Sequence, residues 1–453
     1  MLDINLFREE KGNNIPDIIR ESQRRRFASV EVVDDITQLD KTWRQCTYDL
    51  YGQFELETLR RELNKISKRV RNNKEQQQQV AEKGAAASNM DDAAIRDTHK
   101  RLTAEKEEKE KEVQEAKAAR DARLLSVGNL VHPSVPVSKD EANNVVIRQW
   151  GEKREEPGLR NHVDLVHLLG IVDTKRGAKV AGGRGYFLKG FGVRLNQALV
   201  NFGLDFLSKR GYTEMQPPDL MRDDLMAKCA QIAQFDEDLY KVTGDGGEKY
   251  LIATAEQPLC AYHSDEWIHP KELPLRYAGY SPCYRKEAGS HGRDTLGIYR
   301  VHQFDKVEQF CITSPNCNDS WEMFEAMIEN SEDFYKELNI PYQIVSIVSG
   351  KLNPAAAKKY DLEAWFPASQ TYRELVSCSN CTDYQSRRLE IRYGHKTGNE
   401  QAKQYVHLLN STLTATQRTM CCILENYQRE NGVEIPEVLR PYVGGTDFLP
   451  FQT

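Results

Sequence analysis

The chain has 453 residues, of which 39% are hydrophobic and 29% charged, and its formal net charge is −6. This length allows roughly two or three domains with a sizeable core. The negative net charge excludes a general attraction to nucleic acid, so such a contact would need a local basic patch. No apolar run approaches about 18 residues, and we expect no membrane-spanning helix.

The cysteines and the first residues indicate a cytoplasmic location. The ten cysteines are scattered without a paired framework, which fits a reducing compartment. The N-terminal residues are acidic and lack an apolar segment, so they do not resemble a targeting peptide. Cys378 and Cys381 form a lone CxxC pair, and without a second pair at metal-site spacing we expect no zinc.

Residues 35–127 carry a coiled-coil pattern, with apolar residues at 4-3-4 spacing in a first helix. Gly84–Asp91 would break this helix, and a second helix is expected from Asp92 to Val127. Two such helices predict an antiparallel hairpin, an arm about 50–65 Å long, within an N-terminal domain of residues 1–130. The seam residues of the first helix are Leu39, Trp43, Cys46 and Leu50.

The end of the first arm helix is strongly basic. Residues 60–74 hold seven Lys or Arg residues against a single acid, Glu62. A charge run is usually a solvated helix surface, but the second helix is mixed in sign, which favours a phosphate-binding stripe on the first. The basic residues are Arg60, Arg61, Lys65, Lys68, Arg69, Arg71 and Lys74.

A connector rich in breakers and charge is expected at residues 131–160, followed by a second domain at 161–453. This domain would open with a hairpin at Ala181–Tyr186. An amphipathic helix with apolar residues from Leu195 to Phe206 follows, and later a helix from Ser320 to Leu338. Short β-rich runs between the helices predict an α+β fold with a largely antiparallel sheet.

The most polar β-type segments surround Tyr284-Arg285-Lys286-Glu287 and the run from Gly297 to Glu308. Side chains two apart share one face of a strand, which would put Arg285 with Glu287, and Arg300 with Phe304 and Glu308. The same parity adds His302 and Lys306, for which we find no specific role. There is no P-loop, so a nucleotide here would be held by side chains on a sheet.

With these motifs the chain resembles class II aminoacyl-tRNA synthetases, and specifically the seryl-tRNA synthetases of the cytosolic eukaryotic type. The resemblance covers nearly the whole chain, arm included. The five segments that carry it, in order, are Arg210–Pro218 (motif 1), Thr254–Pro258 (the serine-binding loop), Tyr284–Glu308 (motif 2), Glu374–Asn380, and Asn410–Gln428 (motif 3). Motif 3 has Ser, Thr and Ala where class II enzymes usually have glycines.

The resemblance implies a class II catalytic domain that activates L-serine with ATP, releases pyrophosphate and passes serine to tRNA. Arg285 and Arg418 would be the catalytic residues, and Glu374 and Ser377 would hold Mg²⁺ with ATP. The implied serine-binding residues are Thr254, Ala255, Glu256, Arg285, Glu308, Asn410 and Thr412. The implied ATP-binding residues are Arg285, Lys286, Glu287, Arg300, Val301, Phe304, Glu374, Leu375, Val376, Ser377 and Arg418.

The resemblance also implies partners. The basic arm residues would bind the long variable arm of tRNA(Ser) through its phosphates, with little base readout. Motif 1 with Pro218 would build a homodimer interface. Two other functions stay open at this point: an adenylate-forming paralogue that loads serine onto a carrier, and a non-catalytic RNA-binding scaffold.

Each motif alone also has a plainer interpretation. Thr254 to Glu256 could be a helix N-cap, Arg285 and Glu287 surface charges, and Phe304 a core residue. These interpretations would all have to hold together, at family spacing. Cys421 and Cys422 are expected to be core residues of a helix.

Overall fold

The computed structural model describes residues 1–8, 15–52, 88–230, 238–244, 246–287, 296–395 and 403–452. The chain divides into two compact units, a helical unit of residues 3–20 and 29–127 and a larger unit of residues 1–2, 21–28 and 128–453. In the described residues no helix is long and apolar enough to cross a membrane.

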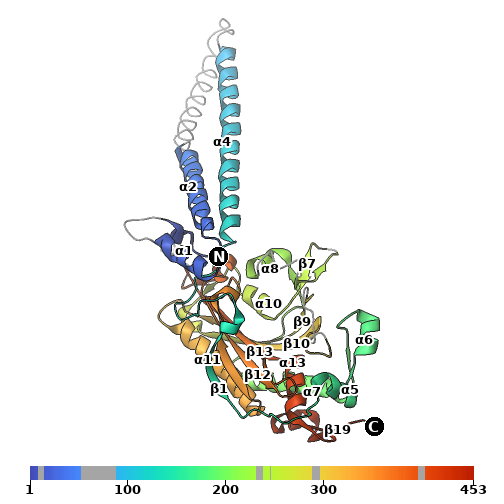
Figure 1. The fold of residues 1–453 in the computed structure, drawn as a ribbon. Coiled ribbons are helices and arrows are strands. Elements are labelled where there is room, and N and C mark those ends of the chain that lie inside the picture. The colour runs from blue at the N-terminus through green and yellow to red at the C-terminus, as the bar shows by residue number, and fades with distance from the viewer. Residues whose placement is uncertain are drawn as a thin grey trace. The chain divides into compact units, whose positions relative to one another are not determined.

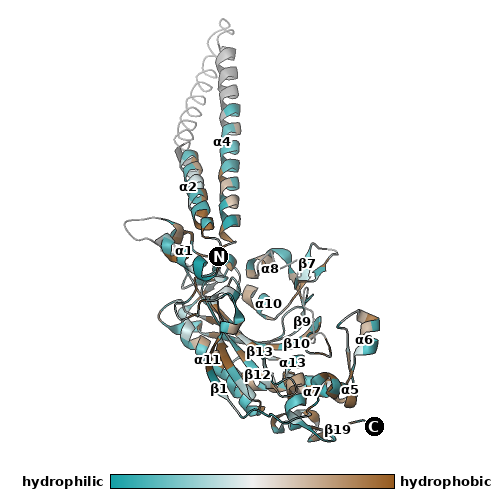
Figure 2. Ribbon diagram, in the orientation of Figure 1, coloured by the Kyte–Doolittle hydropathy of each residue, from teal (hydrophilic) through white to brown (hydrophobic). Residues whose placement is uncertain are grey.

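Two long helices, α2 (Glu31–Gly52) and α4 (Ser88–Leu124), pack along each other in the helical unit (Figure 1). Arg123 pairs with Asp35 at 2.6 Å, and Arg120 approaches Asp40 to 3.4 Å, so the two helices are antiparallel as predicted. Hydrophilic residues dominate the described part of α4 (Figure 2). The four seam residues of α2 are all half-buried.

Two details of the arm differ from the sequence prediction. Helix α4 already includes Ser88–Asp91, the last residues of the expected break, and it ends at Leu124 rather than Val127. Its residues are good helix formers apart from Ser, Asn and Asp at the start, which helix termini tolerate. The seven basic residues expected to bind tRNA, between positions 60 and 74, lie outside the described residues.

A buried carboxylate joins the segments of the helical unit. Asp40 is only 1% exposed and pairs with Arg8 at 2.9 Å, Arg44 at 3.0 Å and Arg120 at 3.4 Å. Burial alone would raise the pKa of Asp40, but the three arginines hold it below its ordinary value. Arg120 also lies over the ring of Trp43, 4.2 Å from its centroid.

An eight-stranded sheet forms the frame of the larger unit, in the order β1-β11-β12-β13-β16-β10-β9-β4. Neighbouring strands are antiparallel except β4 and β9, which confirms the α+β prediction. Strand β1 lies within the range expected as a connector. The strands are β1 (Val145–Trp150), β4 (Thr213–Met215), β9 (Leu275–Tyr284), β10 (Gln303–Thr313), β11 (Tyr342–Ser346), β12 (Lys358–Phe366), β13 (Thr371–Asn380) and β16 (His407–Ala415).

Three helices cover one face of this sheet: α7 (Phe191–Ser208), α11 (Asp319–Glu337) and α13 (Thr416–Tyr427). The helices predicted at Leu195–Phe206 and Ser320–Leu338 are thereby confirmed. Cys421 and Cys422 are fully buried in α13, as expected. The opposite face is covered in part by a second apolar cluster that includes Leu259 and Phe310, and the rest of this face carries polar side chains.

The hairpin predicted at Ala181–Tyr186 is wrong. Helix α6 (Thr174–Ala181) ends there at Gly182, whose φ of 82° lies in the left-handed region. The flanking strands β2 (Val172–Asp173) and β3 (Phe187–Leu188) pair with each other instead. Gly177 of α6 allows this return, because a Cβ there would lie 2.3 Å from the backbone of Tyr186.

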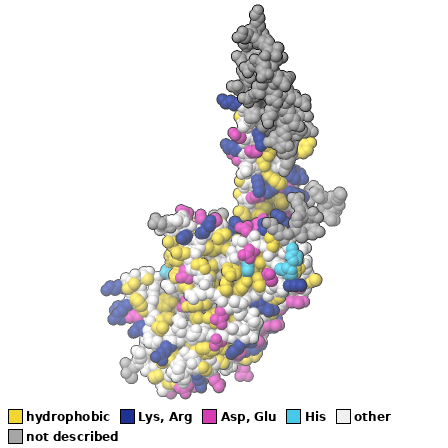
Figure 3. Space-filling model, turned by 180° about the vertical axis from the view of Figure 1, so that it is seen from behind, with side chains coloured by type: hydrophobic (Ala, Val, Ile, Leu, Met, Phe, Trp, Pro, Cys, Tyr) yellow, Lys and Arg dark blue, Asp and Glu magenta, His cyan; other side chains and the backbone are white. Residues whose placement is uncertain are grey.

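The remaining helices and strands are short. They are α1 (Ile15–Arg25), α5 (His162–Leu168), α8 (Asp223–Cys229), α10 (Glu256–Ala261), α12 (Ser386–Leu389), β5 (Leu220–Arg222), β6 (Lys241–Val242), β7 (Lys249–Leu251), β8 (Trp267–Ile268), β14 (Arg392–Tyr393), β15 (Gln404–Tyr405), β17 (Gln428–Arg429), β18 (Gly432–Glu434) and β19 (Phe448–Pro450). The face of the larger unit seen in Figure 3 carries side chains of both charges.

Candidate active site

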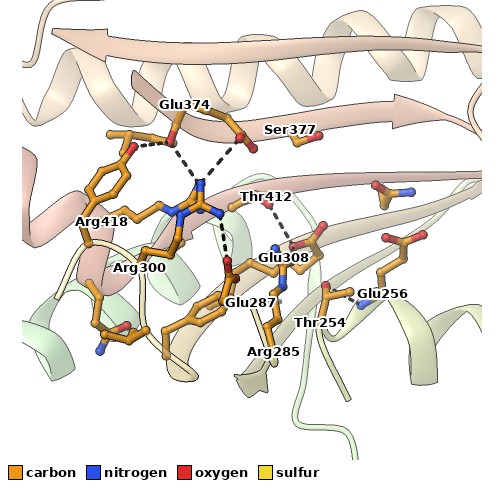
Figure 4. A pocket seen from close by; sticks show the side chains of 18 of the residues that line it. Thr254, Glu256, Arg285, Glu287, Arg300, Glu308, Glu374, Ser377, Thr412 and Arg418 are labelled. Atoms are coloured by element: carbon orange, nitrogen blue, oxygen red, sulfur yellow. Dashed lines mark hydrogen bonds and ion pairs between the residues drawn. The ribbon is translucent and has the colours of Figure 1, made fainter. Parts of the chain in front are cut away.

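A cavity of about 370 Å³ opens on the polar face of the sheet, between β10, β13, β16 and the start of α13 (Figure 4). It gathers side chains from segments more than 150 residues apart in the sequence, from Thr254 to Arg418. All the residues predicted to bind serine or ATP line it except Ala255, Lys286 and Val376.

The closed end of the cavity lies on strands β10 and β16, where Glu308 is paired in register with Thr412. Thr412 donates its hydroxyl to the carboxylate of Glu308 at 3.3 Å, and the ammonium of Lys306 lies 2.5 Å from the same oxygen. Each of these three residues is less than 10% exposed. This end therefore offers a set of buried polar groups held in place by one another.

A second carboxylate reaches this end from helix α10. The backbone N–H of Glu256 donates to the hydroxyl of Thr254 at 3.2 Å, so these residues both begin a helix and line the cavity. Gln385 donates to the carboxylate of Glu256 at 3.3 Å. Burial raises the pKa of Glu256, Glu308 raises it further, and Lys306 partly opposes the shift.

Gly279 lets α10 approach the sheet this closely. A Cβ on Gly279 would lie 2.7 Å from Leu259 and 3.0 Å from the Cβ of Ala255. Ala255 is fully buried against this glycine, which explains why its side chain is not part of the cavity wall. Val376 likewise belongs to the hydrophobic core.

Part of the open end of the cavity is built from residues beyond the ends of strands β9 and β10. Strand β9 ends at Tyr284 and β10 begins at Gln303, so Arg285, Glu287 and Arg300 lie in loops. The prediction that strand parity aligns them is therefore wrong. They meet because Arg300 donates to the carboxylate of Glu287 at 2.9 Å, while the backbone N–H of Arg285 donates to the carbonyl of His302 at 2.8 Å.

Arg285 lies between the two ends. Its Nε donates to the carbonyl of Ala253 at 3.3 Å, next to the Thr254 loop, and its guanidinium lies 5.3 Å from the ring centroid of Phe304. The ring of Phe304 packs against the hydrophobic core and also lines the cavity. The core and site interpretations of Phe304 are thus both compatible with its position.

Arg418 and Glu374 complete the open end. Arg418 lies 3.7 Å from the carboxylate of Glu374 and 5.2 Å from the ring centroid of Tyr299, whose hydroxyl donates to the carbonyl of Glu374 (Figure 4). Desolvation would raise the pKa of Glu374, but the nearby cations, with Arg418 and Lys359 foremost, lower it below its ordinary value. This carboxylate is therefore ionised at neutral pH.

Comparison with known proteins gives the context of this cavity. Residues 1–131 match the seryl-tRNA synthetase N-terminal domain, and residues 240–427 match the class II tRNA synthetase core domain of the G, H, P, S and T enzymes. The chain is 70% identical to the cytoplasmic serine–tRNA ligase of Arabidopsis thaliana, over 100% of this chain and 97% of that protein. The chain belongs to the seryl-tRNA synthetase family.

Solved structures of the seryl-tRNA synthetase family support the same assignment. The cytoplasmic serine–tRNA ligase of Naegleria fowleri, in complex with AMP, is 50% identical with a TM-score of 0.86, and the alignment covers 100% of this chain and 99% of that one. The Pyrococcus horikoshii seryl-tRNA synthetase, complexed with ATP, is 40% identical with a TM-score of 0.84, and the alignment covers both chains fully. The resemblance inferred from the motifs is confirmed.

Within this synthetase, several cavity residues were missed by the sequence analysis. Lys306 was noticed from strand parity but given no role. Tyr299 lies inside the Gly297–Glu308 run, where only its aromatic character could have marked it. Ser379, Ala415 and Gln417 lie in the segments that carry the resemblance but were given no role. Asn353 and Lys359 lie outside every motif.

Cys378 and Cys381, the lone CxxC pair of the sequence, are both buried on and beside β13 of this synthetase. Cys381 accepts a hydrogen bond from the side-chain amide of Asn410 at 3.7 Å. Among the described residues there is no group of three or more His, Cys, Asp or Glu residues suited to hold a metal ion. Lys286, also outside the cavity wall, donates its backbone N–H to the carbonyl of Asp238 at 3.0 Å.

Proposed function

We propose that the cavity activates L-serine with ATP to give seryl-adenylate and pyrophosphate, and that serine then passes to the 3′ end of tRNA(Ser). Membership of the family makes the chain an ATP-dependent aminoacyl-tRNA ligase. The observation that carries the finer proposal is the position of Arg285, between a closed end with buried hydrogen-bonding groups and an open end with Arg300 and Arg418.

Arg285 is proposed to hold the α-phosphate of ATP and the carboxylate of serine together. Two anions repel each other in a cavity of low dielectric, and a planar guanidinium can pair with both at once. Its Nε is already engaged with the carbonyl of Ala253, which fixes the direction of the fork. Arg285 also lines the cavity, where its guanidinium would meet both anions.

The closed end suits a small hydroxyl amino acid. The ammonium of serine would pair with Glu256 and Thr254, and its hydroxyl would meet Glu308 and Thr412, with Asn410 alongside. A site whose buried polar groups need a hydroxyl partner rejects alanine and glycine, because those groups would otherwise go unpaired. Threonine would be excluded by lack of room for its extra methyl group.

The open end suits the nucleotide. We propose that adenine stacks between the ring of Phe304 and the guanidinium of Arg418, both of which line the cavity. The main chain of Val301 and the carboxylate of Glu287 would meet the polar edge of the base. Arg300, paired with Glu287 at 2.9 Å, would contact the distal phosphates.

The reaction needs no protein nucleophile and no general base. The serine carboxylate attacks the α-phosphate in line, the bond to the β-phosphate breaks, and pyrophosphate leaves with the electron pair. The chain contributes position and charge: Arg285 and Arg418 stabilise the negative charge that develops around phosphorus. The 3′-terminal adenosine of tRNA then takes the seryl group from the adenylate.

The residues at the open end fit Mg²⁺ as the companion of ATP. Magnesium prefers carboxylate, hydroxyl, water and phosphate oxygens. The ionised carboxylate of Glu374 and the hydroxyl of Ser377 project from β13 into the cavity and would hold the ion. When bound, Mg²⁺ would neutralise phosphate charge and orient the leaving pyrophosphate.

Serine-dependent ATP–pyrophosphate exchange tests the activation step. We expect exchange with serine, and none above background with alanine or threonine at equal concentration; cysteine, whose thiol is a weaker hydrogen-bonding group, should support little. Robust exchange with alanine would contradict the hydroxyl-reading cavity. An absence of exchange with serine, in a folded protein, would contradict the proposed activity.

The arm is proposed to bind tRNA(Ser), with the basic residues of positions 60–74 on its phosphates. Deleting residues 60–105 and joining the helices with a short turn should leave pyrophosphate exchange near the full-length rate and abolish most tRNA charging. If the deletion variant still charged tRNA, the proposed role of the arm in tRNA recognition would be contradicted. The salt dependence of tRNA binding should be weaker in the deletion variant than in the full-length chain, because fewer phosphate contacts remain.

We also propose a cytoplasmic homodimer. The relatives named above include cytoplasmic serine–tRNA ligases. Strand β4 of motif 1 is the last strand at one edge of the sheet, and Pro218 lies exposed shortly after it. Light scattering of the full chain should give twice the monomer mass of 52.0 kDa; a monomer at micromolar concentration would contradict the dimer.

A further inference from the structure

We propose that Lys306, to which the motifs assign no role, neutralises Glu308 and thereby determines how serine is oriented. The same pairing excludes amino acids with a cationic side chain. The inference rests on the proposed function and deepens it. Lys306 decides which of two buried carboxylates receives the ammonium of the substrate and which receives the hydroxyl.

The closed end of the cavity poses an electrostatic problem. Glu256 and Glu308 both line it, and both would attract an ammonium group. Their mutual repulsion is visible in Glu256, whose pKa is raised by burial and further by Glu308. A serine zwitterion brings only one ammonium, so one carboxylate needs a partner from the protein.

Lys306 forms its ion pair with Glu308, and it acts on Glu256 only through a longer-range attraction. The ammonium of Lys306 lies 2.5 Å from Glu308 Oε2, and the side chains of the pair are only 7% and 2% exposed. The two residues are two apart on strand β10, so their side chains share a face. Glu256 has instead the neutral amide of Gln385 as its hydrogen-bond partner.

The charges of the bound state then balance. Glu308, already paired with Lys306, keeps its capacity to accept a hydrogen bond and would take the serine hydroxyl together with Thr412. Glu256 would take the serine ammonium, and Arg285 its carboxylate. Every buried charge has an opposite, which is the condition under which buried ions are tolerated.

The same arrangement rejects a cation at the position of the hydroxyl. L-2,3-Diaminopropionate has the size of serine, but an ammonium replaces the hydroxyl. In the wild-type protein this ammonium would meet Lys306 beside a carboxylate that is already neutralised. Without Lys306, Glu308 would be a buried anion that lacks a counter-ion, and it would favour this cation.

The test compares pyrophosphate exchange with serine and with L-2,3-diaminopropionate in Lys306→Met, which keeps the length of the side chain and removes its charge. We expect the ratio of kcat/KM for diaminopropionate over serine to rise at least about 100-fold relative to wild type, since breaking a buried ion pair has effects of this size. Lys306→Gln, which keeps a polar end group, should shift the ratio in the same direction. This variant replaces Lys306→Met in the test if the Met variant does not fold.

Two matched controls separate the proposal from general damage to the cavity. The double variant Lys306→Met/Glu308→Gln has no anion at this position and should lose the gained preference for diaminopropionate. Lys336→Met removes a surface lysine paired with Asp333 at 3.2 Å and should leave the wild-type ratio unchanged.

The outcomes are distinguishable. Wild-type protein without serine-dependent exchange would contradict the proposed function itself. Wild-type exchange with serine, together with an unchanged ratio in both Lys306→Met and Lys306→Gln, would overturn only the role of Lys306. Equal diaminopropionate preference in the single and double variants would also overturn it, because the attraction would then not come from Glu308.

Discussion

The two ends of the cavity are built differently. At the closed end Lys306, Glu308 and Thr412 lie on strands and are nearly inaccessible: Glu308 is 1% exposed and Lys306 5%. At the open end Arg285, Glu287 and Arg300 lie in loops, and Glu374 projects from β13. The side chains of Arg300 and Glu374 are 32% and 46% exposed. Selectivity between amino acids needs fixed, desolvated partners, whereas ATP must enter and pyrophosphate must leave. The difference predicts which kinetic constant each residue controls.

Arg285 belongs to both ends, so its loss should have the largest effect. Arg285→Ala is expected to reduce serine-dependent exchange by at least about 10³-fold, because two anions lose their shared counter-charge. Measured exchange with saturating serine and ATP checks this. Arg222→Ala, which removes an exposed arginine paired with Asp224, is the matched control and should exchange normally. Near-normal exchange in Arg285→Ala would contradict the proposed catalytic role of Arg285.

Glu256 should act on the serine end alone. Glu256→Gln is expected to lower kcat/KM for serine by about 10- to 100-fold, the effect of losing a charged hydrogen bond, and to leave KM for ATP unchanged. Parallel titrations of serine and ATP measure both. A change in KM for ATP as large as that for serine would contradict the separation of the two ends.

The pH dependence of the wild type should report the same carboxylate. The pKa of Glu256 is raised by burial and by Glu308, and only the ionised form can pair with an ammonium. As the pH falls, Glu256 is protonated at a higher pH than an ordinary glutamate, so kcat/KM for serine should decline earlier on the acid side. This early acid decline should disappear in Glu256→Gln. If the decline were unchanged in the variant, another titrating group would be its cause.

Phe304 should act on the nucleotide end with a smaller effect. Phe304→Leu keeps an apolar side chain but loses the aromatic face, and base–aromatic stacking contributes about 1–3 kcal/mol. We therefore expect KM for ATP to rise about 10-fold, with KM for serine nearly unchanged. Replacement by Tyr, which keeps the ring, should retain most of the ATP affinity. Equal loss in the Leu and Tyr variants would argue against stacking.

The closed end could be foreseen from the sequence better than the open end. Lys306 and Glu308 are two apart on one strand, and parity placed them on one face. The same reasoning failed for Arg285 and Arg300, which lie outside the strands and meet through loop backbone contacts. Their convergence depends on a positive φ of 51° at Glu287 and on pairing with Arg300, which no local pattern encodes.

Contacts between side chains from different segments of the chain also could not be predicted from the sequence. Parity put Lys306 and Glu308 on the cavity face, but the arrival of Glu256 beside them depends on how α10 is held against the sheet. Lys359 and Asn353 enter the cavity from segments that matched no motif. The family resemblance supplied roles only for positions inside motifs, and these residues lie outside them or were not assigned by them.

Gly279 allows a small and specific test of how α10 sets the closed end. In Gly279→Ala the new Cβ would lie 2.7 Å from Leu259, which can adjust, and 3.0 Å from the Cβ of Ala255, which belongs to the backbone segment between Thr254 and Glu256. The segment must move by a few tenths of an ångström, and we expect KM for serine to rise roughly 3- to 10-fold with KM for ATP unchanged. Gly203→Ala in α7 is the control, because its Cβ would meet neighbours no closer than 3.4 Å, and Ala is favoured over Gly within a helix. An equal rise in both KM values for Gly279→Ala would mean that α10 and the open end move together, and that the two ends of the cavity are not independent.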